Sequence, residues 1–97
     1  MAADYVLSRK ADGDVQAIAE FSLQTWGMEQ AEEYILGLHA TFQMLAEFPD
    51  LGRDAGDLRR GYRKIETASH VVFYRKTHSG VLIVRVLHQS MDFSRYL

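Results

Sequence analysis

The sequence predicts an α+β fold in which a hairpin of two helices packs on a small antiparallel sheet. Between residues 8 and 48, apolar side chains recur every three or four positions, which is the spacing of amphipathic helices. Between residues 62 and 91, β-branched and aromatic residues form short runs, as they do in strands. A polar, glycine-containing stretch separates the two halves. With one more short strand at the start, the predicted element order is β-α-α-β-β-β.

Two helices are predicted in the first half of the chain. Residues 5–7 form the short strand, Ser8 after it is a candidate N-cap, and Gly27 is a candidate helix stop. Pro49 ends the second helix, and the very short link between the helices makes them antiparallel. Each helix has an apolar stripe: Ala11, Val15, Ile18, Ala19 and Trp26 in the first, and Ala31, Ile35, Leu38, Phe42 and Leu45 in the second. We assign Trp26 to the core on this pattern.

Residues 69–91 predict a β-hairpin with its turn at residues 77–80, preceded by a short strand at residues 62–66. A turn centred between His78 and Ser79 fixes the register and therefore the two faces. One face then carries Val71, Phe73, Leu82, Val84 and Val86. The other face carries Val72, Tyr74, Ile83 and Leu87, together with Lys76 and Arg85.

Neither face of this hairpin is polar, whereas a half-exposed antiparallel sheet normally alternates apolar with polar residues. The two helices can cover one face, and little sequence remains to cover the other. We therefore expect the face with Val72, Tyr74, Ile83 and Leu87 to be covered by a partner polypeptide. Phe21, Leu23 and Tyr34 would offer a second surface if they lie outside the core. The tail after Met91 can cap the end of the sheet.

Length and composition limit the possible functions. The 97 residues are enough for one domain, which we expect to span residues 1–97. There is no cysteine, which excludes disulfides, thiol nucleophiles and thiolate metal sites. The sequence starts without a long apolar run, so we expect no signal peptide, no membrane span and a cytoplasmic location. The net charge of −2 lacks the basic excess of nucleic-acid-binding proteins, and we expect no sequence-specific nucleic-acid binding.

Few residues are candidates for chemistry. His70 and His88 should lie near one another across the hairpin, but no third ligand is placed, so we expect no metal site and no cofactor. His88 is the only candidate acid or base, and it would need Arg63 or Arg85 to stabilise phosphate charge. The simpler interpretation of His88 is a packing residue at a strand end. The cluster of Arg59, Arg60, Arg63 and Lys64 is either a solvated charge run or a contact surface for an acidic partner.

Four segments, in order and with family-like spacing, resemble the ParE toxins of the RelE/ParE superfamily. They are AEFPDLG, LRRGYRK, SHVVFYR and VRVLHQSMD. The resemblance extends from Tyr5 to Asp92, and its most specific part is the stretch RVLHQSMD, residues 85–92. ParE proteins are the toxins of type II toxin–antitoxin modules, so the resemblance implies the RelE/ParE fold and a toxin function.

The resemblance also implies partners. A ParD-like antitoxin would bind the chain in a hetero-oligomer, and DNA gyrase would be the target of a toxin that is not an enzyme. We assign the antitoxin contact to the apolar face described above together with Arg63 and Arg85. The RelE branch instead cleaves messenger RNA on the ribosome, and that alternative would use His88, Arg85 and Arg63 as catalytic residues. The chain lacks the dense Lys/Arg cluster that nuclease relatives carry near the C-terminal strand.

Overall fold

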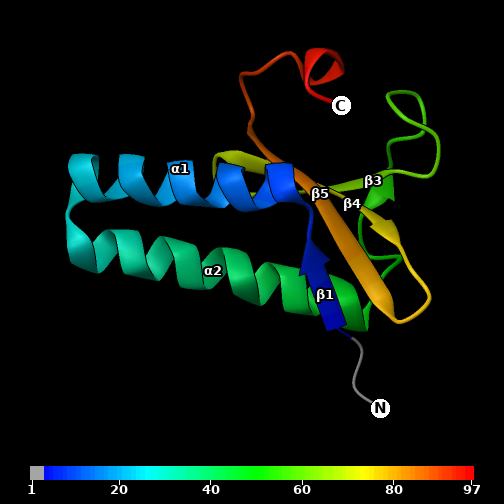
Figure 1. Cartoon of the computed structure of the whole chain (residues 1–97), viewed down its shortest axis with the longest axis horizontal. Helices are drawn as coiled ribbons and strands as arrows, with labels where there is room; N and C mark the ends of the chain where they lie inside the picture. The colour runs from blue at the N-terminus through cyan, green and yellow to red at the C-terminus, as the bar shows by residue number, and fades with distance from the viewer. Residues whose placement is uncertain (1–3) are drawn as a thin grey trace.

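Two antiparallel helices lie against one face of a five-stranded sheet (Figure 1). The structure is a computed structural model and describes residues 4–97. The strand order is β1-β5-β4-β3-β2, with β1 parallel to β5 and the other neighbours antiparallel. The elements are β1 (Asp4–Leu7), α1 (Arg9–Trp26), α2 (Met28–Glu47), β2 (Arg53–Asp54), β3 (Arg63–Thr67), β4 (His70–Lys76), β5 (Gly80–His88) and the 3₁₀ helix η1 (Phe93–Arg95). The predicted α+β class is confirmed, and the two-residue β2 is an addition to it.

The helices begin and end where the sequence predicts. Ser8 caps α1: its hydroxyl oxygen accepts a hydrogen bond from the Ala11 N–H at 3.0 Å and donates one to the Val84 carbonyl in β5 at 2.9 Å. Gly27 closes α1 and opens α2 with a φ of 89°, a conformation that favours glycine. Within residues 4–97, neither helix is long and apolar enough to cross a membrane.

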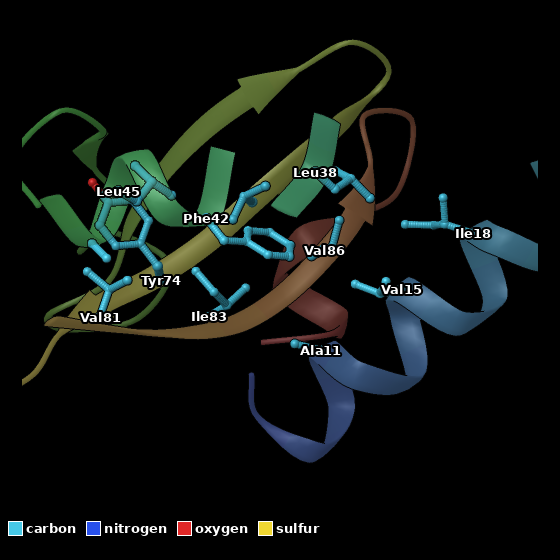
Figure 2. Close-up of a cluster of buried hydrophobic side chains, with 12 residues drawn as sticks. Ala11, Val15, Ile18, Leu38, Phe42, Leu45, Tyr74, Val81, Ile83 and Val86 are labelled. Atoms are coloured by element: carbon cyan, nitrogen blue, oxygen red, sulfur yellow. The ribbon is translucent and has the colours of Figure 1, made fainter. Parts of the chain in front are cut away.

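The main core fills the space between the helices and the sheet (Figure 2). The side chains that meet there come from both helices and from β4 and β5: Ala11, Val15, Ile18, Leu38, Phe42, Leu45, Ala46, Val72, Tyr74, Val81, Ile83 and Val86. The assignment of Trp26 to this core is wrong. Its side chain is 47% exposed, because the corner between α1 and α2 lies at the end of the hairpin away from the strands (Figure 1).

A second, smaller core covers the opposite face of the sheet. Phe73 packs edge-to-face on Phe93 of the tail, with ring centroids 5.0 Å apart. The buried residues of this cluster are Ala55, Val71, Phe73, Val84 and Leu87, and the partly buried ones are Leu58, Tyr62, Leu82, Met91, Phe93 and Leu97. The loop at residues 55–62 and the tail at residues 91–97 therefore supply the second cover. The tail was expected only at the end of the sheet, whereas it covers part of this face.

The predicted register holds in the half of the hairpin near the turn and shifts by one residue beyond it. Tyr74 lies opposite Ile83 as predicted, but Phe73 lies opposite Arg85, so β5 has one extra residue at this β-bulge. Side chains alternate between faces, and the extra residue therefore exchanges the predicted faces of Val86 and Leu87. His70 and His88 remain cross-strand neighbours.

Candidate functional site

The sheet face that we expected a partner to cover is already enclosed by this chain. Val72, Tyr74 and Ile83 lie beneath the helices with 0% exposure, and Leu87 lies beneath the tail and loop with 2%. The expectation of an open apolar face is therefore wrong. The physical reason is that the sequence between β2 and β3 and the sequence after β5 fold back on the sheet, although neither has a regular apolar period.

Arg63 and Tyr74 hold the turn that follows α2. The Arg63 guanidinium donates to the carbonyl oxygens of Asp50 and Gly52, at 3.2 and 2.6 Å. The Tyr74 hydroxyl donates to the Pro49 carbonyl and accepts from the Gly52 N–H, both at 2.8 Å. A Cβ atom on Gly52 would lie 2.5 Å from that hydroxyl, so the close approach requires glycine. These contacts give both side chains a structural task in the fold.

Arg85 forms a two-pronged ion pair with Asp14 of α1. Its Nε and Nη2 donate to the two carboxylate oxygens at 2.8 and 2.7 Å, and both side chains are 15% exposed. Asp14 also accepts the Val86 N–H at 3.0 Å, and Arg85 Nη1 donates to the Tyr96 carbonyl at 3.1 Å. The hydrogen bond from Arg85 to Asp14 raises the pKa of the guanidinium above its ordinary value. The pair thus joins α1, β5 and the tail.

The two histidines meet at the end of the hairpin, as predicted. Their ring centroids are 5.4 Å apart, and the Tyr34 hydroxyl of α2 lies 2.6 Å from His70 Nδ1. Burial, and secondarily repulsion from His88, lowers the pKa of His70. His88 is exposed, and its Nδ1 accepts the Ser90 N–H at 3.1 Å. In the described part of the chain, no three histidine or acidic side chains gather as metal ligands would.

The three residues assigned to the nuclease alternative are each engaged with different groups. Arg63 binds the backbone of the turn after α2, Arg85 binds Asp14, and His88 binds Ser90. No hydrogen bond joins any two of the three within residues 4–97. Of the three, only Arg85 lines the cleft described next.

That cleft, of about 680 Å³, lies on the sheet face opposite the helices and carries a concentration of positive charge. Among the described residues, six cationic side chains line it and no aspartate or glutamate does. We call it the cationic cleft. Its lining consists of Ser8, Arg9, Lys10, Arg59, Tyr62, Arg75, Leu82, Val84, Arg85, Arg95, Tyr96 and Leu97.

Large apolar side chains are exposed at the junction of α1 and α2, which we call the helical corner and define as Phe21, Leu23, Trp26 and Met28. Their exposed fractions range from 47% to 72%. The Phe21 and Trp26 rings meet edge-on at 6.1 Å, and Trp26 lies at the same distance from Tyr34. The condition set for a second surface is met by Phe21 and Leu23, which lie outside the core, but not by Tyr34, which is half-buried against it. Exposed apolar clusters of this kind mark protein–protein contacts.

Residues 5–93 match the family model described as "ParE toxin of type II toxin-antitoxin system, parDE". The chain belongs to the ParE toxin family. It is 48% identical over 93 residues to "Toxin ParE1" of Caulobacter vibrioides, covering 96% of each chain. It is 40% identical over 98 residues to "Toxin ParE1" of Mycobacterium tuberculosis, covering 100% of each.

The fold is also shared with a solved structure. The chain "Chromosomal ParDE TA system from P. aeruginosa" superposes with a TM-score of 0.75 at 19% identity, covering 90% of this chain and 96% of that one. The resemblance to ParE toxins and the expected RelE/ParE-like fold are therefore confirmed.

In this ParE-family chain, sequence reasoning missed the cationic cleft. It pointed to the run of Arg59, Arg60, Arg63 and Lys64, of which only Arg59 lines the cleft. The other cations come from the start of α1, from β4 and β5, and from η1. One available signal was that residues 11–47 contain seven acidic residues and no lysine or arginine, which concentrates the positive charge elsewhere.

Proposed function

We propose that this ParE-family toxin inhibits DNA gyrase by binding it, and that a ParD-like antitoxin neutralises it in a hetero-oligomer. The observation that carries the proposal is the family match over residues 5–93, together with full-length relatives named as ParE toxins. The separate engagements of His88, Arg85 and Arg63 favour this mode of action over the ribonuclease alternative, which needs those groups at one reacting phosphate.

A supercoiling assay tests the target. Purified toxin, titrated into gyrase and relaxed plasmid, should inhibit supercoiling, and the product of the adjacent antitoxin reading frame should restore it. A translation reaction with ribosomes and messenger RNA is the control for the alternative. If saturating toxin leaves supercoiling unchanged while messenger RNA is cleaved, and His88→Ala abolishes that cleavage without unfolding the chain, the ribonuclease assignment replaces this one.

We place the antitoxin contact on the helical corner. Val72, Tyr74, Ile83 and Leu87 cannot reach a partner unless the fold opens, because each is at most 2% exposed. The corner instead presents large apolar side chains that the fold leaves in water. Aromatic side chains at such positions supply a large share of interface energy. A partner helix laid across the corner would remove this surface from water.

The corner assignment predicts a separation of binding from stability. Phe21→Glu combined with Trp26→Glu should weaken antitoxin binding by at least about tenfold, because two interface anchors are lost. The melting temperature should change little, since neither side chain belongs to the core. Phe48→Glu is the matched control, because Phe48 is 62% exposed at the opposite end of α2. Titration calorimetry measures antitoxin binding by the double variant and by the control, and thermal denaturation measures their melting temperatures. Equal weakening of binding by the control, or no weakening by the double variant, would contradict the assignment.

A further inference from the structure

The two layers of the molecule carry opposite charge. The helical layer is acidic beyond the first residues of α1, which contribute Arg9 and Lys10 to the cationic cleft, and the rest of the cleft lies on the other side of the sheet. The Debye length at physiological ionic strength is about 8 Å, so charges separated by the whole sheet and the helices behind it are largely screened from one another. An anion in the cleft therefore experiences the local positive charge and not the net charge of −2. The screened glutamates are Glu20, Glu29, Glu32, Glu33 and Glu47.

Five of the six cations in the cleft are available to a ligand. Arg85 is held by Asp14, whereas no other lining cation makes an ion pair within residues 4–97. These unpaired cations come from α1, from the loop after β2, from β4 and from η1, so they surround the cleft and do not form one row. They are Arg9, Lys10, Arg59, Arg75 and Arg95.

The form of the cleft favours a nucleic-acid strand over a peptide. β4, in the floor of the cleft, is paired on both sides, whereas β1 pairs only residues 80–83 of β5. Beyond them the Ser8 hydroxyl binds the Val84 carbonyl and the Asp14 carboxylate binds the Val86 N–H, so these side chains occupy the edge that an added strand would use. A ligand must therefore be held by side chains. A phosphodiester backbone presents one negative charge at every nucleotide, and arginine, lysine and tyrosine are its usual partners. The Tyr96 ring, 41% exposed beside these cations, gives a base a surface on which to stack.

We propose that the cationic cleft binds a single strand of DNA through its phosphodiester backbone, without reading the sequence. The choice of DNA over RNA rests on the proposed function, because gyrase acts on DNA. The cleft would then hold the toxin on the nucleic acid while another surface contacts the enzyme.

Fluorescence anisotropy with a labelled oligothymidine tests the proposal on the intact toxin. Each phosphate contact to a single strand contributes about 0.7 to the slope of log affinity against log salt, so five cations predict a slope of about −3.5. The triple variant Arg59→Gln, Arg75→Gln, Arg95→Gln should reduce the slope by about 2 and weaken binding at low salt by at least about tenfold. All three side chains are exposed, so the fold should persist.

A matched triple variant controls for net charge. Arg53→Gln, Lys64→Gln and Lys76→Gln remove the same three charges outside the cleft, and slope and affinity should stay near those of the unmodified chain. Absence of binding at about 50 mM salt, or equal loss in both triple variants, overturns the proposal. A polyglutamate peptide and unlabelled DNA are then compared as competitors. If the peptide displaces the labelled oligothymidine at a lower concentration than the DNA does, the cleft is instead assigned to an acidic protein. Oligouridine binding about tenfold tighter would assign it to RNA.

The supercoiling assay separates this proposal from the proposed function. If the toxin leaves gyrase active but binds oligothymidine with the expected salt slope, the gyrase assignment fails and the cleft assignment stands. If the toxin inhibits gyrase without binding oligothymidine, the reverse holds.

Discussion

Through its ion pair with Arg85, Asp14 helps to join three parts of a small fold, namely α1, β5 and the tail. Its carboxylate accepts two hydrogen bonds from Arg85 and one from the Val86 N–H at the β-bulge. No sequence pattern singles it out, because an aspartate in the first turns of a helix is favourable with or without such a partner. Its role depends on a strand residue 71 positions away in the chain.

We expect Asp14→Ala to lower the free energy of unfolding by about 2–4 kcal/mol, because it leaves the Arg85 guanidinium mostly buried and unpaired. The matched control is Arg53→Ala, which breaks an ion pair with Glu66 whose side chains are both more than 60% exposed. That change should cost less than about 1 kcal/mol. Urea denaturation measures both variants, and similar losses for the two would show that the Asp14 pair contributes no more than a surface one.

At the scale of elements, the parts fixed by local chemistry were predicted and the parts fixed by distant contacts were not. Ser8, Gly27 and the turn of the hairpin act within a few residues of their own positions, so these positions follow from the sequence. The β-bulge has no such signal, since Val84 and Arg85 suit a regular strand equally well. The cover of the sheet face opposite the helices was not predicted, because its apolar residues are scattered through the loop at residues 55–62 and the tail at residues 91–97.

Tyr34 and His70 connect α2 to β4, and this contact should depend on pH. His70 with a bare Nδ1 accepts a hydrogen bond from the Tyr34 hydroxyl, whereas protonated His70 would have to donate one to the hydroxyl oxygen. Burial and repulsion from His88 lower the folded-state pKa of His70, and attraction to Asp14 opposes them more weakly. Below the ordinary histidine pKa of about 6.5, the unfolded chain therefore binds more protons than the folded one.

The free energy of unfolding of the toxin should accordingly fall as the pH is lowered through about 6.5 toward the lowered pKa of His70 in the folded chain. His70→Gln should reduce this dependence, because it removes the titrating imidazole. His78→Gln is the matched control, a substitution at an exposed histidine in the turn of the hairpin. Urea denaturation at pH values from about 8 to 5 tests this; a gain in stability on acidification over that range would contradict the sign.

At the scale of the whole molecule, the fold class and family could be predicted, and the candidate sites could be predicted only in part. The helical corner was predicted only as a conditional surface through Phe21 and Leu23, and Trp26, which also belongs to it, was wrongly assigned to the core. The cationic cleft was not predicted, because its lining consists of single residues from segments that are distant in sequence. Net charge then misleads, since opposite charges on two layers cancel in the sum while remaining separate in space.

The tail that completes the smaller core has a practical consequence for laboratory work. Leu97 packs against that core and also lines the cationic cleft. An affinity tag joined after Leu97 would begin at the rim of the cleft, where an acidic tag would compete with an anion for the cations and a polyhistidine tag would add binding groups of its own. A removable tag placed ahead of β1 is therefore the sound choice for every titration described above.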